Sequence, residues 1–358
     1  MKWVISCLAA LVLLSGQACA ASIPETLEEA LPESAEVLLE EGDFSTGEGF
    51  LAGVRSLGGE AARQLEKTLE RRLKGAASIL AVVILCGAME GFQRGAGGKD
   101  TALVTMAGAL TIALLTAGDI GSLMGLGRKT IGDLSAFSRV LLPVLAAAAA
   151  AAGGMTTATV QQVSAVLLSD VLIRLISSLL MPMVYLYTAV LTASCALPES
   201  RLDALSAGLK KAVTWVLTTV LLCFTLYLSV TKVVTGAVDA AGVRVAKAAI
   251  SGVVPVVGGI ISEAAETVLA GAGILKNTIG IFGTLAVLAA CIHPFIQLGV
   301  QYLLYKLAAF LASVLGAPRL YKLIDGLGGA FGLILGMTGS CAVLLLVSVL
   351  TSLAAVMP

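Results

Sequence analysis

Residues 251–283 read SGVVPVVGGIISEAAETVLAGAGILKNTIGIFG, and they mix charge, glycine and apolar residues more densely than any other part of the chain. Pro255 lacks a backbone donor and disrupts a helix interior. Gly258 and Gly259 follow it, and each glycine costs roughly 1 kcal/mol relative to alanine within a helix. The stretch therefore predicts a broken or re-entrant helix near Pro255–Gly259.

Charged side chains follow this break. Glu263 and Glu266 are three residues apart, which places both carboxylates on one face of a helix. Lys276 and Asn277 come ten residues after Glu266, so a hairpin could bring the ammonium group to the carboxylates. An ionisable group at bilayer depth costs roughly 2.5 to 3.5 kcal/mol, whereas charge at the headgroup level is tolerated, and the sequence leaves both depths open. The candidate functional residues are Pro255, Gly258, Gly259, Glu263, Glu266, Lys276 and Asn277.

The composition defines the class of protein. Hydrophobic residues make up 58% of the 358 residues and charged residues 13%, and the mean hydropathy is +0.98. Several apolar runs approach the roughly 20 residues that a helix needs to cross a bilayer. We therefore predict an all-α, polytopic helical membrane protein in contact with the lipid bilayer. The formal net charge is zero and no basic patch alternates with aromatic residues, which excludes a nucleic-acid-binding protein.

The N-terminal part precedes the membrane domain. Residues 1–20 predict a cleavable signal peptide, with Lys2, an apolar core and small residues at Ala18 and Ala20. A lipoprotein anchored at Cys19 and an uncleaved first anchor are the alternatives. Residues 21–74 predict an acidic extracytoplasmic segment, ending in an amphipathic helix over 64–74 that lies on the bilayer.

Residues 75–358 predict the multi-span membrane domain, beginning with spans at 76–92 and 101–118. The basic residues within 94–99, 201–211 and 319–322 predict cytoplasmic loops. Residues 121–138 predict a glycine-rich connection, because they carry Arg128, Lys129 and Asp133. Residues 159–197 exceed one span, so Pro182 predicts a turn or break between two.

The chain also matches itself. Six residues from Arg201 to Ala212 recur from Arg319 to Ala330 at an offset of 118, and Pro143 and Pro182 recur as Pro255 and Pro294 at an offset of 112. The matches predict an internal repeat of about 137–231 and 249–357. Since both matched linkers are basic and both predict cytoplasmic loops, the repeats are expected to be parallel.

Residues capable of catalysis are sparse. The cysteines are scattered singly without a CxxC pair, and His293 is the only histidine, so no metal, cofactor or catalytic set is predicted. Asp170 and Arg174 are four residues apart in an apolar run, which predicts an intramembrane ion pair, with a substrate or proton path as the alternative.

The run PVVGGIISEAAETVLAGAGILKNTIGIFG at residues 255–283, together with the predicted signal and acidic segment, resembles the stage III sporulation protein AE family. The resemblance implies a non-enzymatic membrane subunit of the channel or secretion-like complex that endospore-forming Firmicutes assemble between mother cell and forespore. It also implies a location in the mother-cell membrane around the forespore. The implied partners are other stage III sporulation membrane proteins and their ATPase.

A second class of function stays open at this point. A broken helix with intramembrane charge and an internal repeat is also typical of secondary transporters, and the site would then lie at residues 251–283. A complex subunit needs partners, whereas a transporter works alone.

Overall fold

The computed structural model describes residues 24–32, 35, 47–95, 102–152, 167, 170–196, 202–253 and 258–354. Within these residues every regular element is a helix. The elements in chain order are α2 (Glu25–Glu28), α4 (Gly47–Gly95), α5 (Ala102–Ala151), the π-helix η1 (Ile176–Leu180), α7 (Met181–Ala196), α8 (Leu202–Val253), α9 (Gly258–Val314) and α10 (Pro318–Ala354). The predicted signal peptide lies outside the described residues.

Six helices in the described part of the chain are long and apolar enough to cross a membrane. The all-α, polytopic class predicted from composition is therefore confirmed. Most of these helices are much longer than one span requires. With 57 residues at 1.5 Å per residue, α9 is about 85 Å long, compared with a bilayer core of about 30 Å.

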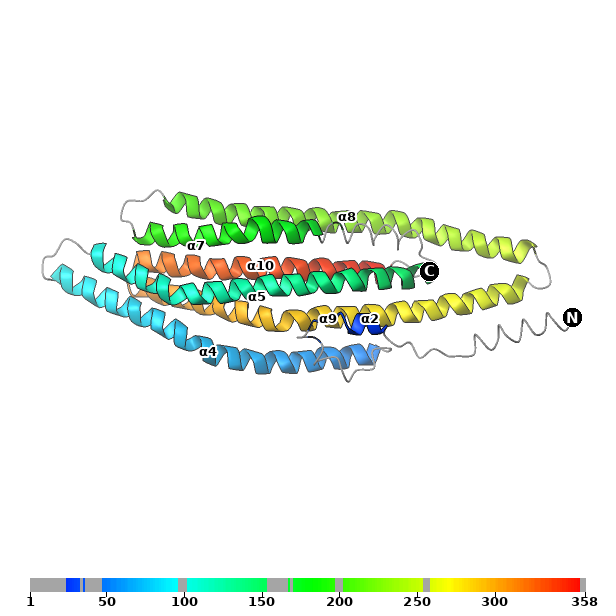
Figure 1. Ribbon diagram of the computed structural model, residues 1–358, viewed down its shortest axis with the longest axis horizontal. Coiled ribbons are helices and arrows are strands. Elements are labelled where there is room, and N and C mark those ends of the chain that lie inside the picture. Colours follow the sequence, from blue (N-terminus) through cyan, green and yellow to red (C-terminus); the bar gives the residue numbers. More distant parts are fainter. Residues whose placement is uncertain are drawn as a thin grey trace.

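The long helices lie side by side and alternate in direction (Figure 1). The connections from α4 to α5, from α7 to α8 and from α9 to α10 all lie at the same end, on the left in Figure 1. We call this end the connection end. The described basic residues of the three segments, Arg94, Lys210, Lys211, Arg319 and Lys322, thus lie toward one end of the bundle, as the predicted topology requires. Their cytoplasmic side stays a prediction.

The α9–α10 connection shows why the chain reverses there. Gly316 has φ of +75°, a left-handed conformation that glycine adopts without penalty. The Ala317 N–H donates to the Ala312 carbonyl at 3.2 Å and the Gly316 N–H to the Ser313 carbonyl at 3.1 Å, which is a Schellman motif. Pro318 then begins α10, where its missing N–H would have no partner anyway.

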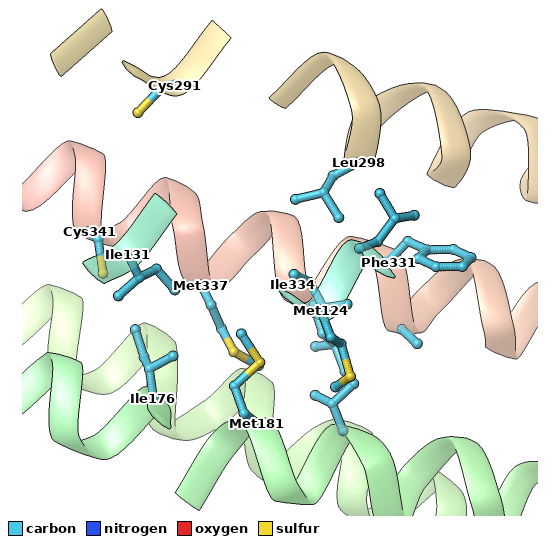
Figure 2. Packing of buried hydrophobic residues seen from close by; sticks show 14 of the residues in the cluster. Met124, Ile131, Ile176, Met181, Cys291, Leu298, Phe331, Ile334, Met337 and Cys341 are labelled. Carbon is cyan, nitrogen blue, oxygen red and sulfur yellow. The ribbon is translucent and has the colours of Figure 1, made fainter. Parts of the chain in front are cut away.

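The apolar core runs along α5, α7, α9 and α10 (Figure 2). On α5, Met124, Ile131 and Leu134 face it, at the three- and four-residue spacing of one helix face. The prediction that 121–138 forms a connection is wrong, because this segment is the middle of α5. Gly121, Gly125, Gly132, Arg128 and Lys129 lie on the exposed face, while the buried stripe continues and includes Gly127.

Pro182 does not separate two spans. The described helix runs from residue 170 to residue 196, and the π-helix η1 immediately precedes the proline. A proline ring clashes with the carbonyl four residues earlier, here that of Ser178. The wider π turn relieves this clash while the helix continues.

Two further helices are more continuous than the sequence suggested. Residues 64–74 and the first predicted span belong to the single helix α4, which packs along α9, so 64–74 is not a separate surface helix. Helix α9 is unbroken from Gly258 onward. The helical break therefore falls between Val253 and Gly258, where α8 ends and the oppositely directed α9 begins. Pro255 lies outside the described residues.

The directions of the helices bear on the predicted repeat. The hairpins α7–α8 and α9–α10 both run to the connection end and back (Figure 1). Pro182 and Pro294, which match at the offset of 112, lie in the first helix of each hairpin. This is the arrangement that a parallel repeat requires, and the duplication itself stays a prediction.

Candidate functional site

The residues predicted as functional are spread along the first part of α9. Gly258 and Gly259 begin the helix, and Glu263 and Glu266 follow, although their side chains lie outside the described part. Lys276 is buried and Asn277 is exposed. Ten residues of continuous helix place Lys276 about 15 Å along the axis from Glu266. The hairpin predicted to join ammonium and carboxylates is therefore wrong.

The predicted pairing of Asp170 also differs in the structure. The Asp170 carboxylate accepts a hydrogen bond from Arg139 Nη2 of α5 at 2.8 Å, rather than pairing with Arg174. Arg174 is exposed four residues further along the helix. Arg139 lies 31 residues earlier in the chain, on the neighbouring helix α5. The spacing of residues in the sequence does not reveal such a pair between helices.

A stripe of polar side chains on α9 is the most extensive polar feature of the described bundle. His293, Gln297, Gln301 and Tyr305 recur every four residues and share one face of the helix. This polar stripe contacts α4 and α5, in a region where α9 has no Asp, Glu, Lys or Arg from residue 277 to residue 305. The stripe is the candidate functional site of this chain.

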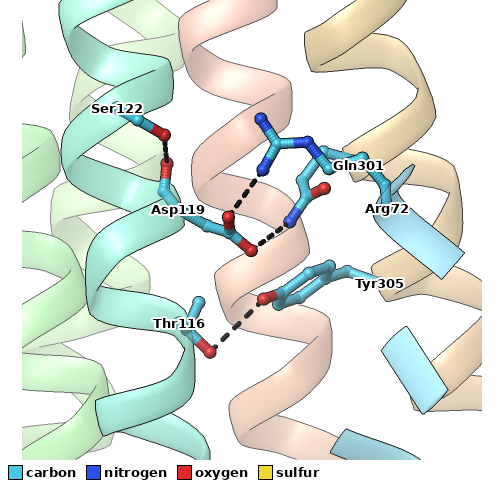
Figure 3. A network of polar contacts seen from close by, with 6 residues as sticks. All are labelled: Arg72, Thr116, Asp119, Ser122, Gln301 and Tyr305. Carbon is cyan, nitrogen blue, oxygen red and sulfur yellow. Dashed lines mark hydrogen bonds and ion pairs between the residues drawn. The ribbon is translucent and has the colours of Figure 1, made fainter. Parts of the chain in front are cut away.

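One carboxylate joins three helices at this site (Figure 3). Asp119 of α5 accepts a hydrogen bond from Arg72 Nη1 of α4 at 2.6 Å and another from Gln301 Nε2 of α9 at 2.9 Å. One turn away, the Tyr305 hydroxyl donates to Thr116 Oγ1 at 3.3 Å. We call these five residues the Asp119 network. Because each helix contributes a polar group, the network defines how α4, α5 and α9 are aligned.

A second set of contacts continues the stripe. His293 Nδ1 lies 2.9 Å from Gln64 Oε1 of α4, and His293 Nε2 lies 2.9 Å from Gln297 Nε2. With these amide orientations, a neutral imidazole protonated at Nδ1 satisfies both contacts. The structure thus places this histidine at the α4–α9 interface.

The Asp119 network also contains an unsatisfied acceptor. Gln301 is 2% exposed, and its Oε1 atom has no hydrogen-bond partner. Leaving a buried polar group unpaired costs roughly 1 to 3 kcal/mol, so polar residues here are not explained by packing alone. Among the described residues no three His, Cys, Asp or Glu side chains converge as a metal site would require. The arrangement is suited to interhelical recognition.

Polar contacts near the connection end join the two hairpins to each other and α9 to α10. Asp203 at the start of α8 pairs with Lys322 of α10 at 2.5 Å, and Lys306 of α9 pairs with Asp325 of α10. Deeper in the bundle, the Tyr187 hydroxyl donates to the Gly326 carbonyl at 2.9 Å. These contacts fix α7 and α8 relative to α10.

Sequence reasoning did not identify the Asp119 network. The four-residue spacing of the polar stripe is visible in the sequence, and it could have indicated a polar helix face. Arg72, Asp119 and Gln301 are separated by 47 and 182 residues, and no local pattern relates them.

The family model described as "Stage III sporulation protein AE" matches residues 42–356. The chain is similar to the stage III sporulation protein AE of Bacillus subtilis (strain 168), at 24% identity over 197 residues. The aligned part covers 55% of this chain and 49% of that relative, so it spans about half the relative's length. No solved structure matches the chain.

Proposed function

The chain belongs to the stage III sporulation protein AE family, and we propose that it is a non-enzymatic membrane subunit of a mother cell–forespore channel or secretion-like complex. The observation that carries this proposal is the family match over 42–356, which includes all six candidate membrane helices. We further propose the mother-cell membrane around the forespore as its location. Other stage III sporulation membrane proteins and their ATPase are the proposed partners.

The polar groups of the described bundle support a subunit that acts through its architecture. Asp119 is engaged by Arg72 and Gln301, and Asp203 and Asp325 are engaged by lysines. Side chains used in this way align helices. We propose that Glu263, Glu266 and Lys276 act in assembly or conduction, and that their part of α9 meets partners.

The test compares partner capture with transport. The tagged chain would be expressed in an endospore-forming host that lacks its own copy, and heat-resistant spores would be counted. Cross-linking and purification from sporulating cells should recover stage III membrane proteins and an ATPase. A host that forms normal spores without the chain would refute the proposal. Solute uptake by the purified chain alone in liposomes, without partner recovery, would favour a secondary transporter.

A further inference from the structure

Helix α8 contains one uncharged stretch whose length matches a single membrane span. Residues 212–231 of this helix contain no Asp, Glu, Lys or Arg and are bounded by Lys211 and Lys232. Twenty residues at 1.5 Å per residue span about 30 Å, which equals one bilayer core. Trp215 and Leu222 within this stretch are 67% and 58% exposed, as expected of side chains that face lipid.

Contacts between neighbouring helices show which residues of α9 lie beside this uncharged stretch of α8. A Cβ added at Gly336 of α10 would lie 3.6 Å from Leu217 of α8. On either side of Gly336, Gly332 lies against the Tyr302 ring of α9 and Gly339 against the Phe295 ring. Leu217 therefore lies at the level of α9 between Phe295 and Tyr302.

The contacts of the polar stripe show which residues of α4 lie beside the same part of α9. Gln64 contacts His293, while Arg72 and Gln301 share Asp119. Since α4 and α8 run in opposite directions, counting residues from these contacts aligns α8 residues 212–231 with α4 residues 55–74. The segment of α4 that lies level with α8 residues 212–231 is thus the charged one, whereas its apolar residues 76–92 lie beyond it toward the connection end.

At this level α4 presents charge on the outside of the bundle. Arg63, for example, has a side chain that is 71% exposed. The exposed charged residues of α4 between 55 and 74 are Arg55, Arg63, Glu66, Lys67, Glu70, Arg71 and Lys74. On the neighbouring α5, Arg128 and Lys129 are also exposed. Basic residues outnumber acidic ones in this set, which we call the charged face.

Lipid does not solvate such a surface. Each charged side chain at bilayer depth costs roughly 2.5 to 3.5 kcal/mol, and charged residues in membrane proteins accordingly face protein or water-filled cavities. The charged face lies on the outside of a single bundle, so one copy cannot enclose it. Several copies arranged with their charged faces inward would leave Trp215 and Leu222 outward in lipid.

We propose that the charged face of α4 and α5 lines a water-filled passage enclosed by several copies of this chain, and that its excess of basic side chains favours small anions. The proposal rests on the proposed role as a subunit of a membrane channel complex, and it specifies which surface lines the path. Low-dielectric walls strengthen the effect of fixed charge on mobile ions.

Cysteine reactivity in intact membranes tests this arrangement. Among the described cysteines Cys223 is the exposed one, so Cys223→Ala provides a background of low reactivity. In this background we would compare two α4 variants, Arg63→Cys and Lys67→Cys, with two α8 variants, Trp215→Cys and Leu222→Cys. All four positions lie at the same level of the bundle. We expect membrane-impermeant thiosulfonates to label the two α4 cysteines and to leave the two α8 cysteines unlabelled.

The charge preference is measured on the same variants. The quantity of interest is the ratio of the labelling rate with an anionic thiosulfonate to the labelling rate with a cationic one. For the α4 cysteines this ratio should exceed that of a free thiol in solution by about tenfold, which is within the range of electrostatic focusing in clefts. Adding Arg71→Glu to Lys67→Cys should lower the ratio. An unchanged ratio would refute anion preference.

Two labelling patterns would overturn the passage itself. If the α4 cysteines react only after detergent is added, the charged face is covered by protein or lipid. If the α8 cysteines react as fast as those of α4, the level of these four positions lies outside the membrane. The bilayer then surrounds residues 76–92 of α4 and 102–118 of α5 instead. Either result with normal spore numbers would leave the role as a membrane subunit intact, because spore formation is counted separately.

Discussion

Removing the carboxylate of Asp119 is expected to weaken the bundle substantially. The side chains of Arg72 and Asp119 are 18% and 29% exposed, so the pair is screened by solvent only in part. A hydrogen bond to a charged group contributes roughly 1.5 to 3 kcal/mol, and breaking a fully buried pair costs roughly 3 to 5 kcal/mol. For Asp119→Leu, which also removes the acceptor of Gln301, we expect a loss of about 2 to 4 kcal/mol.

A double-mutant cycle separates the pair from its surroundings. Arg72→Met and Asp119→Leu would be measured singly and together, by reversible unfolding of the purified protein in mixed detergent micelles. Because the double variant leaves no unpaired charge, it should cost about 1 to 2 kcal/mol less than the sum of the single variants.

The control is a local ion pair within α4, in which the Arg63 side chain is 71% exposed and the Glu60 side chain 27% exposed. Arg63 and Glu60 of α4 form an ion pair of 3.1 Å at i and i+3, with Arg63 largely exposed. Glu60→Gln should change stability by at most about 0.5 kcal/mol. The reasoning would be refuted if Asp119→Leu cost no more than Glu60→Gln, or if the double variant cost the full sum of the two single ones.

Three further predictions concern packing, topology and α9. A Cβ at Gly127 would lie 2.6 Å from Ile334 Cγ2, so Gly127→Leu should cost roughly 1 to 3 kcal/mol in detergent unfolding, whereas Gly125→Leu, at a position with nothing within 4 Å, should be neutral or stabilising. Single cysteines placed in the 94–99, 201–211 and 319–322 segments should all label from the cytoplasmic side, and labelling of the last two from opposite sides would rule out parallel repeats. Replacing Glu263 and Glu266 by Gln and Lys276 by Met should leave membrane abundance unchanged and abolish spore formation. Wild-type spore numbers in the triple variant would refute that functional role, and a loss of membrane abundance would indicate a structural role instead.

The sequence predicted the class of the protein because composition decides it. Apolar runs of span length leave helices as the only plausible way to satisfy the backbone within a bilayer. The sequence also predicted a broken or re-entrant helix near Pro255–Gly259; α8 ends at Val253 and α9 begins at Gly258, and a re-entrant helix there stays a prediction. Helix limits elsewhere were less predictable, because glycines and charges on the outer face of α5 suggested a loop while the buried stripe continued.

The candidate site illustrates what sequence alone leaves undetermined. Residues 251–283 are conspicuous in the sequence because proline, glycines and charged residues interrupt an apolar segment. Asp119 shows nothing unusual in its own segment, and its importance comes from Arg72 on one helix and Gln301 on another. Asp170 likewise pairs with Arg139 of another helix and not with Arg174, four residues away. Partners between helices depend on packing that a single sequence does not specify.

The offset between the two groups of helices suggests what the Asp119 network does. The uncharged parts of α7 to α10 lie at one level, whereas the apolar segments 76–92 of α4 and 102–118 of α5 are displaced toward the connection end by about one bilayer thickness. Apolar contacts alone hold such a displacement weakly, because one leucine can replace another when a helix slides by a turn. The carboxylate of Asp119 can accept from both Arg72 and Gln301 at one register only, which is the best supported use of buried polar groups. We therefore expect loss of this network to shift α4 and α5 along α9 and to expose lysine and arginine side chains of the charged face to lipid.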